Sequence, residues 1–221
     1  MGAILTDFTA EREAMVDRQL SQRGITDPEI LNAFRAVPRE AFVSEEYAHL
    51  AYGDHPLPIE AGQTISQPYI VALMIDAAQI GRGDKVLEVG SGSGYAAAVI
   101  SRIAAKVVGI ERQHDLVEVS RERLKRLGYE NVEIVEGDGT KGVPAEAPFD
   151  AILAAASGSH VPKTLVDQLA PNGCLVMPVG EPGWVQKLVK VTKADDGSLK
   201  QSDLGDVRFV PLIGEEGWKD A

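Results

Sequence analysis

The sequence predicts an α/β protein built on a doubly wound, mostly parallel sheet. Short apolar runs, typical of buried strands, alternate with longer amphipathic segments, typical of helices, from residue 85 to residue 179. The first apolar run ends in a glycine-rich loop, Gly90–Gly94, which leads directly into a helical segment. After Gly180 the apolar runs follow one another without a helix between them, which predicts antiparallel strands at the end of the sheet.

Length and composition indicate one globular unit. The chain has 221 residues, of which 44% are hydrophobic and 25% charged, so it can bury a core and remain soluble. Its net charge of −11 disfavours binding to nucleic-acid phosphates, which requires clustered Lys and Arg. No apolar run is long enough to cross a bilayer, and the single cysteine excludes an intrachain disulfide. We expect a cytoplasmic monomer that binds neither nucleic acid nor membranes.

Helices are expected in front of the glycine loop. Residues 11–22 have an amphipathic pattern, and the capping sequence Thr26–Glu29 starts a second helix. A stretch rich in glycine and proline separates these from a third helix, predicted over residues 68–78. The inner face of this third helix is predicted to carry Ile70, Leu73, Met74 and Ala77. We expect residues 1–80 to form a helical extension that also covers the binding site.

Residues 81–180 are expected to form the cofactor-binding core, and residues 181–221 the C-terminal strands, within a single domain. The predicted strands span residues 85–89, 107–110, 132–135, 149–155, 174–179, 185–192 and 207–212. The predicted helices between them span residues 95–105, 114–127 and 162–169. Asp195-Asp196-Gly197 provides a turn between the last two strands, which predicts an antiparallel hairpin.

The glycine loop is a candidate cofactor site. Gly90, Gly92 and Gly94 follow a buried strand and precede a helix, which brings the backbone close to a ligand. Their spacing differs from the Gly-x-Gly-x-x-Gly of dinucleotide sites, because Tyr95 stands where the third glycine is expected. Glu88, inside the strand, would repel a phosphate and attract an ammonium group. This pattern disfavours NAD and FAD.

Acidic residues end three successive predicted strands. Glu88 precedes the loop. Glu111 ends the next strand and can accept hydrogen bonds from both hydroxyls of a ribose. Asp138 ends the third strand and can accept a hydrogen bond from the amino group of an adenine. Each acid taken alone is more often a solvated strand end. Their joint placement, at the strand ends where α/β sheets bind ligands, favours a shared role. A ligand with an ammonium group, a ribose and an exocyclic amine, and without phosphate, has the parts of S-adenosyl-L-methionine.

The sequence resembles the protein-L-isoaspartate (D-aspartate) O-methyltransferase family over nearly its whole length. The motifs that carry the resemblance are VPRE (37–40) with Phe42-Val43, GQTISQP (62–68), VLEVGSGSGY (86–95), GDG (137–139), APFDAIL (147–153), APNG (170–173), MPVG (177–180) and RFVPL (208–212). The glycine loop would match any class I methyltransferase, whereas GQTISQP and RFVPL are more specific to this family. The resemblance implies a class I methyltransferase (Rossmann-like) fold and S-adenosyl-L-methionine as cofactor, with S-adenosyl-L-homocysteine as product. It also implies methyl transfer to the α-carboxylate of isoaspartyl and D-aspartyl residues in damaged proteins, which starts repair through a succinimide.

The GQTISQP segment, Gly62–Pro68, is expected to lie over the ligand crevice. Ser66 would then donate a hydrogen bond to the substrate carboxylate and fix its angle, a catalytic role that the resemblance also implies. Thr64 and Ile65 would line the cofactor. A carboxylate with a pKa of about 4 is ionised near neutral pH, so the reaction requires neither a general base nor a metal. The alternative for Ser66 is capping of the helix that begins at Pro68, and the two roles are compatible.

The remaining site residues follow from the same motifs. Besides Thr64 and Ile65, the cofactor is expected to contact Glu88, Gly90, Ser91, Gly92, Gly94, Glu111, Asp138 and Gly139. The resemblance implies that the last predicted strand holds the substrate backbone by edge pairing, through Val207, Arg208 and Val210. His160 is a further substrate candidate, in a segment, Ser157–His160, where the family commonly has proline. That departure leaves the shape of the site's rim open.

Two other functions remain possible from the sequence. A methyltransferase for a small acid or phenol would use a closely similar fold, but GQTISQP and RFVPL would then be unexplained. A cofactor-binding module without catalysis is disfavoured, because Glu88, Glu111, Asp138 and Ser66 are all present.

Overall fold

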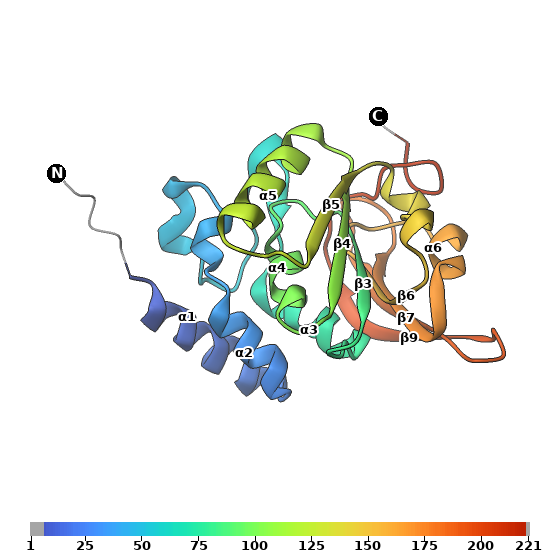
Figure 1. Ribbon diagram of the computed structural model, residues 1–221, viewed down its shortest axis with the longest axis horizontal. Coiled ribbons are helices and arrows are strands. Elements are labelled where there is room, and N and C mark those ends of the chain that lie inside the picture. Colours follow the sequence, from blue (N-terminus) through green and yellow to red (C-terminus); the bar gives the residue numbers. More distant parts are fainter. Residues whose placement is uncertain (1–6, 220–221) are drawn as a thin grey trace.

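The computed structural model describes residues 7–219 of the chain, and its centre is a seven-stranded sheet in the order β5-β4-β3-β6-β7-β8-β9 (Figure 1). Neighbouring strands from β5 to β7 are parallel, and β8 and β9 are added antiparallel. The strands are β3 Lys85–Val89, β4 Lys106–Glu111, β5 Val132–Glu136, β6 Phe149–Ala154, β7 Leu169–Val179, β8 Gln186–Lys193 and β9 Leu199–Val207. The predicted doubly wound sheet with antiparallel C-terminal strands is confirmed.

Helices cover both faces of the sheet. In Figure 1, α4 (Tyr95–Ser101) and α5 (His114–Arg126) lie on one side, and α6 (Lys163–Asp167) lies on the other. Consecutive residues of a strand point to opposite faces, so Val86 belongs to the buried cluster under α4 and Leu87 to the cluster under α6. Strands buried on both faces explain the continuous apolar runs in the sequence.

The N-terminal extension is helical, as predicted. It consists of α1 Thr9–Met15, a π-helical turn Val16–Leu20, a 3₁₀ turn Ser21–Arg23 and α2 Pro28–Ala36. Gly24, at φ 99°, ends the first helical stretch in a left-handed conformation that glycine adopts without strain. The Asp27 side chain accepts a hydrogen bond from the backbone N–H of Glu29 at 2.7 Å, so the predicted cap of α2 is confirmed.

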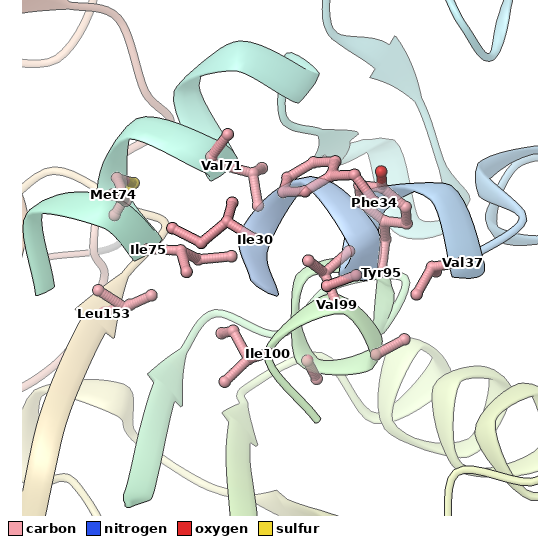
Figure 2. Close-up of a cluster of buried hydrophobic side chains, with 14 of the residues drawn as sticks. Ile30, Phe34, Val37, Val71, Met74, Ile75, Tyr95, Val99, Ile100 and Leu153 are labelled. Carbon is pink, nitrogen blue, oxygen red and sulfur yellow. The ribbon is translucent and has the colours of Figure 1, made fainter. Parts of the chain in front are cut away.

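Helix α3, Pro68–Ala78, has the predicted bounds but buries a different face. Its buried residues are Pro68, Val71, Ala72, Met74, Ile75 and Ala78. Figure 2 shows Val71 and Ile75 directed toward Ile30 of α2, in the cluster that α2 and α3 form with α4 and the sheet. Of the face predicted from the sequence, only Met74 is buried, and Ile70, Leu73 and Ala77 are half-buried. The helix is apolar nearly all round, so its pattern could not select one side.

Some predicted boundaries were wrong. The helix expected over residues 95–105 ends at Ser101, because the Ala105 N–H donates to the Asp84 carbonyl at 2.9 Å and turns the chain into β4. Strand β7 begins at Leu169, which confines α6 to Lys163–Asp167. Short 3₁₀ turns, not identified from the sequence, lie at Arg39–Phe42, Glu45–Leu50, Glu60–Gly62, Gly139–Lys141 and Pro144–Glu146.

The last strand is also displaced from its predicted place. The turn at residues 195–197 is confirmed, but β9 runs from Leu199 to Val207, and residues 208–212 follow it as a segment with one bridge, between Ser157 and Pro211. The prediction failed because most residues of β9 are exposed, which removes the apolar alternation by which a strand is identified. In the described part of the chain, no helix is both long and apolar enough to span a membrane.

Candidate active site

A cavity lies at the carboxyl ends of β3, β4 and β6. Strand β3 has β4 on one side and β6 on the other: the chain runs outward from β3 through β4 to β5, then returns to place β6 on the opposite side of β3. Ligands bind at such a switch point because the loops on its two sides diverge. Of the residues predicted from the sequence, the cavity is lined by Thr64, Ile65, Ser66, Glu88, Gly90, Ser91, Gly92, Glu111, Gly139 and Val210.

The glycine loop curves around the floor of this cavity. Gly90 and Gly92 have φ values of 81° and 50°, in the left-handed region that favours glycine. The Gly90 N–H donates to the Ile110 carbonyl at 2.8 Å, which holds the loop against β4. Gly94 plays a different part, because it does not line the cavity, and a Cβ there would lie 3.2 Å from the Leu124 side chain. Gly94 therefore permits close packing of α4 against α5.

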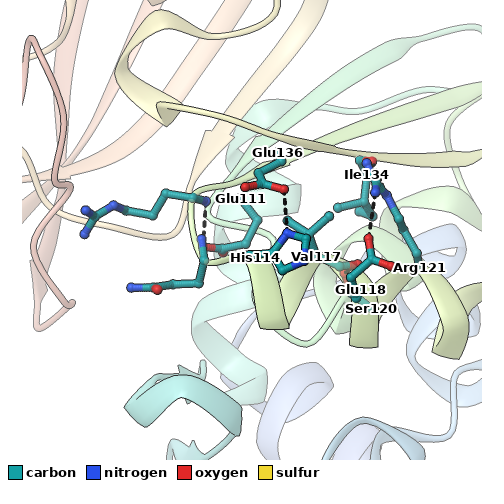
Figure 3. Close-up of polar contacts among 10 residues, drawn as sticks. Glu111, His114, Val117, Glu118, Ser120, Arg121, Ile134 and Glu136 are labelled. Carbon is teal, nitrogen blue, oxygen red and sulfur yellow. Dashed lines mark hydrogen bonds and ion pairs between the residues drawn. The ribbon is translucent and has the colours of Figure 1, made fainter.

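Glu111 links the glycine loop to the start of α5. One carboxylate oxygen accepts the Gly92 N–H at 3.0 Å, and the other accepts the N–H groups of Arg112 at 2.8 Å and Gln113 at 3.0 Å. Figure 3 shows Glu111 at the end of β4, near His114, whose Nδ1 lies 2.8 Å from a Glu136 carboxylate oxygen. The Glu111 carboxylate is buried, and these hydrogen bonds fix its orientation.

Glu88 lies in β3 with 3% of its surface exposed, and it lines the same cavity. Burial, and next the nearby charge of Glu111, raise the pKa of Glu88 well above its usual range. Within residues 7–219, no group forms a hydrogen bond with Glu88 Oε2 or with the buried Ser91 Oγ. Buried polar atoms rarely lack partners, so these two fit a ligand that carries polar, cationic groups.

The structure places Asp138 beside the cavity and not among its lining residues. One of its carboxylate oxygens accepts the Thr140 N–H at 2.9 Å and the Thr140 hydroxyl at 2.7 Å, and the other accepts the Glu215 N–H at 2.8 Å. Burial opposes ionisation of Asp138, but these hydrogen bonds outweigh it and lower its pKa. The adjacent Gly139 does line the cavity.

The segment that carries Ser66 lies over the cavity. Within it, β2 (Thr64–Ile65) pairs antiparallel with β1 (Leu57–Pro58). Nη2 of Arg39, which is fully buried, donates to the Ser66 carbonyl at 2.8 Å. The N-cap of α3 is Gln67, and no side-chain hydrogen bond caps this helix in the described structure. The Ser66 hydroxyl is thus not engaged in the capping role considered from the sequence. Sequence reasoning missed Arg39, although it stands in the VPRE motif.

A second cavity adjoins the first, since the two share five lining residues. Both are lined by Thr64, Ser66, Ala155, Val210 and Pro211. The second is also lined by Val207 and Arg208, so the three predicted substrate residues at 207, 208 and 210 lie together. Ser66 therefore stands where the two cavities meet, in a position to contact ligands held in both.

His160 is not brought to either cavity. Its side chain is exposed, and its Nδ1 lies 2.9 Å from the hydroxyl oxygen of Ser159. A metal site is not seen either: across residues 7–219, the structure contains no cluster of three or more His, Cys, Asp or Glu that could hold an ion.

Comparisons with known proteins agree with this geometry. The family model for protein-L-isoaspartate(D-aspartate) O-methyltransferases matches residues 10–217. Protein-L-isoaspartate O-methyltransferase 2 of Pelobacter propionicus is 53% identical over 207 residues, which cover 94% of this chain and 92% of the relative. A solved protein-L-isoaspartate O-methyltransferase is 33% identical with a TM-score of 0.85, covering 93% of this chain and 67% of its own. A crystal structure from Plasmodium falciparum, described as such an enzyme in complex with S-adenosyl-L-homocysteine, is 32% identical with a TM-score of 0.78, covering 91% of this chain and 98% of its own.

Proposed function

Because this chain belongs to the protein-L-isoaspartate(D-aspartate) O-methyltransferase family, we infer that it methylates the free α-carboxylate of L-isoaspartyl and D-aspartyl residues in damaged proteins, with S-adenosyl-L-methionine as methyl donor. The methyl ester then closes spontaneously to a succinimide, which reopens in part to normal aspartate. The observation that carries the inference is the position of Ser66 between two adjoining cavities: an inner one suited to a cofactor and an outer one lined by the predicted substrate residues Val207, Arg208 and Val210.

The inner cavity fits S-adenosyl-L-methionine, which supplies a methyl group made electrophilic by its sulfonium. Glu88, buried and lacking a partner at Oε2, is proposed to bind the ammonium group. Glu111 is proposed to accept the ribose hydroxyls through the oxygen that accepts only the Gly92 N–H, because the other oxygen already accepts two N–H groups. Thr64 and Ile65 would close the cavity from above, and the remaining predicted contacts are Gly90, Ser91, Gly92 and Gly139.

Asp138 is proposed to accept a hydrogen bond from the adenine amino group. The carboxylate oxygen that accepts the Glu215 N–H retains a lone pair for this purpose. The hydrogen bonds from Thr140 keep the carboxylate ionised and fix its direction. Gly94 supports the same site indirectly, by allowing α4 to start at the glycine loop.

The substrate carboxylate is proposed to enter through the outer cavity. Ser66 would donate a hydrogen bond to one carboxylate oxygen and direct the other toward the methyl group. Arg208, which lines the outer cavity, would attract the anion, and Val207 and Val210 would contact the substrate chain. The GQTISQP segment would exclude water, which weakens a carboxylate nucleophile by solvating it. His160 is exposed and lies outside both cavities, so it is proposed to contact parts of a protein substrate that lie farther from the isoaspartyl residue.

A paired peptide assay tests the activity. An isoaspartyl peptide, its D-aspartyl form and its normal aspartyl twin are incubated with enzyme and S-adenosyl-L-methionine, and methyl esters are measured by mass spectrometry. We expect ester on the isoaspartyl peptide, ester formed more slowly on the D-aspartyl peptide, and none on the twin. Equal methylation of all three peptides, or of none, would contradict the proposed function.

The assembly and location of the enzyme are also proposed. We propose a cytoplasmic monomer that acts on isoaspartyl-containing proteins, with residues 1–80 as the helical and lid region, 81–180 as the cofactor core and 181–221 as the C-terminal strands. The net charge of −11 supports the further proposal that neither nucleic acids nor membranes are partners, because it disfavours association with their anionic surfaces. Light scattering of the purified protein and fractionation of the source cells would test the monomeric state and the location.

A further inference from the structure

The outer cavity has an apolar lip. Val185, just before β8, and Val210 both line this cavity, and they are 51% and 38% exposed. In the described part of the chain, the large hydrophobic side chains that are exposed are Leu50, Trp184, Val185, Leu199 and Val210. Two of these five line the same cavity, and Trp184 adjoins one of them in sequence, so apolar surface is concentrated at its entrance.

The two halves of this lip are fixed to each other by Gln186, which is 1% exposed. The Gln186 side-chain oxygen accepts the Phe209 N–H at 2.7 Å, and its amide donates to the Phe209 carbonyl at 3.3 Å. The same amide donates to the Glu181 carbonyl at 3.2 Å, on the segment that leads to Val185. Hydrogen bonds within the protein thus hold the lip in place, which lowers the entropic cost of binding a substrate there.

Besides Val185 and Val210, the outer cavity is lined by charged residues, Asp206 and Arg208, and by less exposed apolar ones such as Ile70 and Phe209. Asp206, which lines the cavity, pairs with Lys187 at 2.6 Å, and the same lysine lies 3.4 Å from Asp203. Arg208 is available for the substrate carboxylate, as proposed above. A substrate residue next to the isoaspartyl linkage has to lie in the outer cavity, because Ser66 stands at its inner end.

We propose that Val185 and Val210 form a subsite for an apolar side chain adjacent to the isoaspartyl residue, so that this enzyme prefers damaged sites with an apolar flanking residue. This inference rests on the proposed function. Contact with such a side chain removes apolar surface from water on both partners, whereas a polar or acidic neighbour would lose hydration there without a partner.

A peptide panel tests the subsite. The residue before or after isoaspartate is Leu, Ser or Asp, and kcat and KM are measured for wild type, Val185→Ser and Leu199→Ser. Leu199 is the matched control: it is 55% exposed on the same hairpin but pairs with Lys193, whereas Val207 at the cavity pairs with Gln186. We expect wild type to prefer Leu over Ser at one of the two positions by about tenfold in kcat/KM, as for small differences in an apolar pocket.

In Val185→Ser this preference should fall to about twofold, mainly through a higher KM for the Leu peptide. Leu199→Ser should keep the wild-type preference. The subsite is refuted if wild type treats the peptides alike at both positions, or if Val185→Ser retains the full preference. If wild type methylates no isoaspartyl peptide of any kind, the proposed function itself fails, and that result is distinct from a loss of preference alone.

Discussion

Arg39 Nη2 donates a hydrogen bond to the backbone carbonyl of Ser66 at 2.8 Å, from a side chain that is completely buried. Its Nε donates to the Ala51 carbonyl at 2.8 Å, and its guanidinium carbon lies 4.7 Å from the centre of the Tyr95 ring. The Arg39 guanidinium therefore joins three parts of the chain: the segment around Ala51, the GQTISQP segment (62–68) that carries Ser66, and the start of α4 at Tyr95. This bridge ties the backbone at Ser66 to Ala51 and to Tyr95.

We predict that Arg39→Lys lowers both stability and turnover. A lysine ammonium cannot hold two carbonyls in the geometry of a guanidinium, so at least one buried acceptor loses its donor. The free energy of unfolding should fall by about 2 kcal/mol, and kcat by about tenfold, because Ser66 is less well placed. Denaturant unfolding and initial rates measure the two effects.

Arg35→Lys is the matched control for this change. Arg35 lies near the surface, where it pairs with Glu13 at 2.8 Å and Asp17 at 2.7 Å, so its replacement should alter stability by at most about 0.5 kcal/mol and leave kcat unchanged. If Arg39→Lys loses stability but keeps the wild-type kcat, the bridge serves folding and does not position Ser66.

Ser66→Ala should reduce kcat by about a hundredfold, the usual effect of removing one donor to a reacting oxygen. The affinity for S-adenosyl-L-homocysteine should change little, because Ser66 lies where the two cavities meet and its hydroxyl caps no helix. Titration calorimetry and initial rates measure these two quantities. Ser159→Ala, outside both cavities, should resemble wild type. Equal losses of cofactor affinity and kcat would show that Ser66 maintains the conformation of the GQTISQP segment and does not act on the substrate carboxylate.

The sequence predicted the sheet and the glycine loop because each has a local signature, whereas the expectation for Ser66 came from the resemblance of the motif around it. The buried strands are continuous apolar runs, and the capping sequence at Asp27 begins α2 where predicted. The buried side of α3 and the course of β9 could not be predicted, since one helix is apolar all round and one strand is polar on most of its surface. The role of Arg39 depends on contacts made far along the chain, and a lone Arg in a sequence does not indicate them.

Asp138→Asn should weaken recognition of the adenine amino group. An Asn amide can place only one oxygen, whereas Asp138 accepts from both Thr140 and Glu215 with its two oxygens. The test compares S-adenosyl-L-homocysteine with S-inosyl-L-homocysteine, which carries an oxygen in place of that amino group. Wild type should bind the adenosyl ligand about tenfold more tightly, and the variant should discriminate less.

The ratio of the two affinities is independent of any general loss of stability in the Asp138 variant. Thr140→Val serves as control, because it removes the hydroxyl donor to Asp138 while leaving the carboxylate in place. It should retain most of the discrimination between the two ligands. An unchanged ratio in Asp138→Asn would show that the carboxylate holds the Glu215 segment and does not contact adenine.

Glu88 should make stability fall as pH rises. Its pKa is raised in the folded protein, first by burial and then by the charge of Glu111, so the folded state retains a proton that the unfolded chain has already lost. The stabilising contribution is complete below the usual glutamate pKa and is lost as pH rises through the raised value. The free energy of unfolding should decrease in that window by up to about 1.4 kcal/mol per pH unit.

Glu88→Gln mimics the protonated side chain and should remove this part of the slope, making the variant more stable than wild type toward neutral pH. Unfolding curves over a pH series, with and without S-adenosyl-L-homocysteine, measure both effects. The cofactor's ammonium group should stabilise ionised Glu88, so the ligand should raise the stability of wild type more than that of the variant. Glu118→Gln, on the exposed face of α5, should keep the wild-type slope. If the free energy of unfolding depends on pH in the same way in wild type and in Glu88→Gln, folding does not raise the pKa of Glu88.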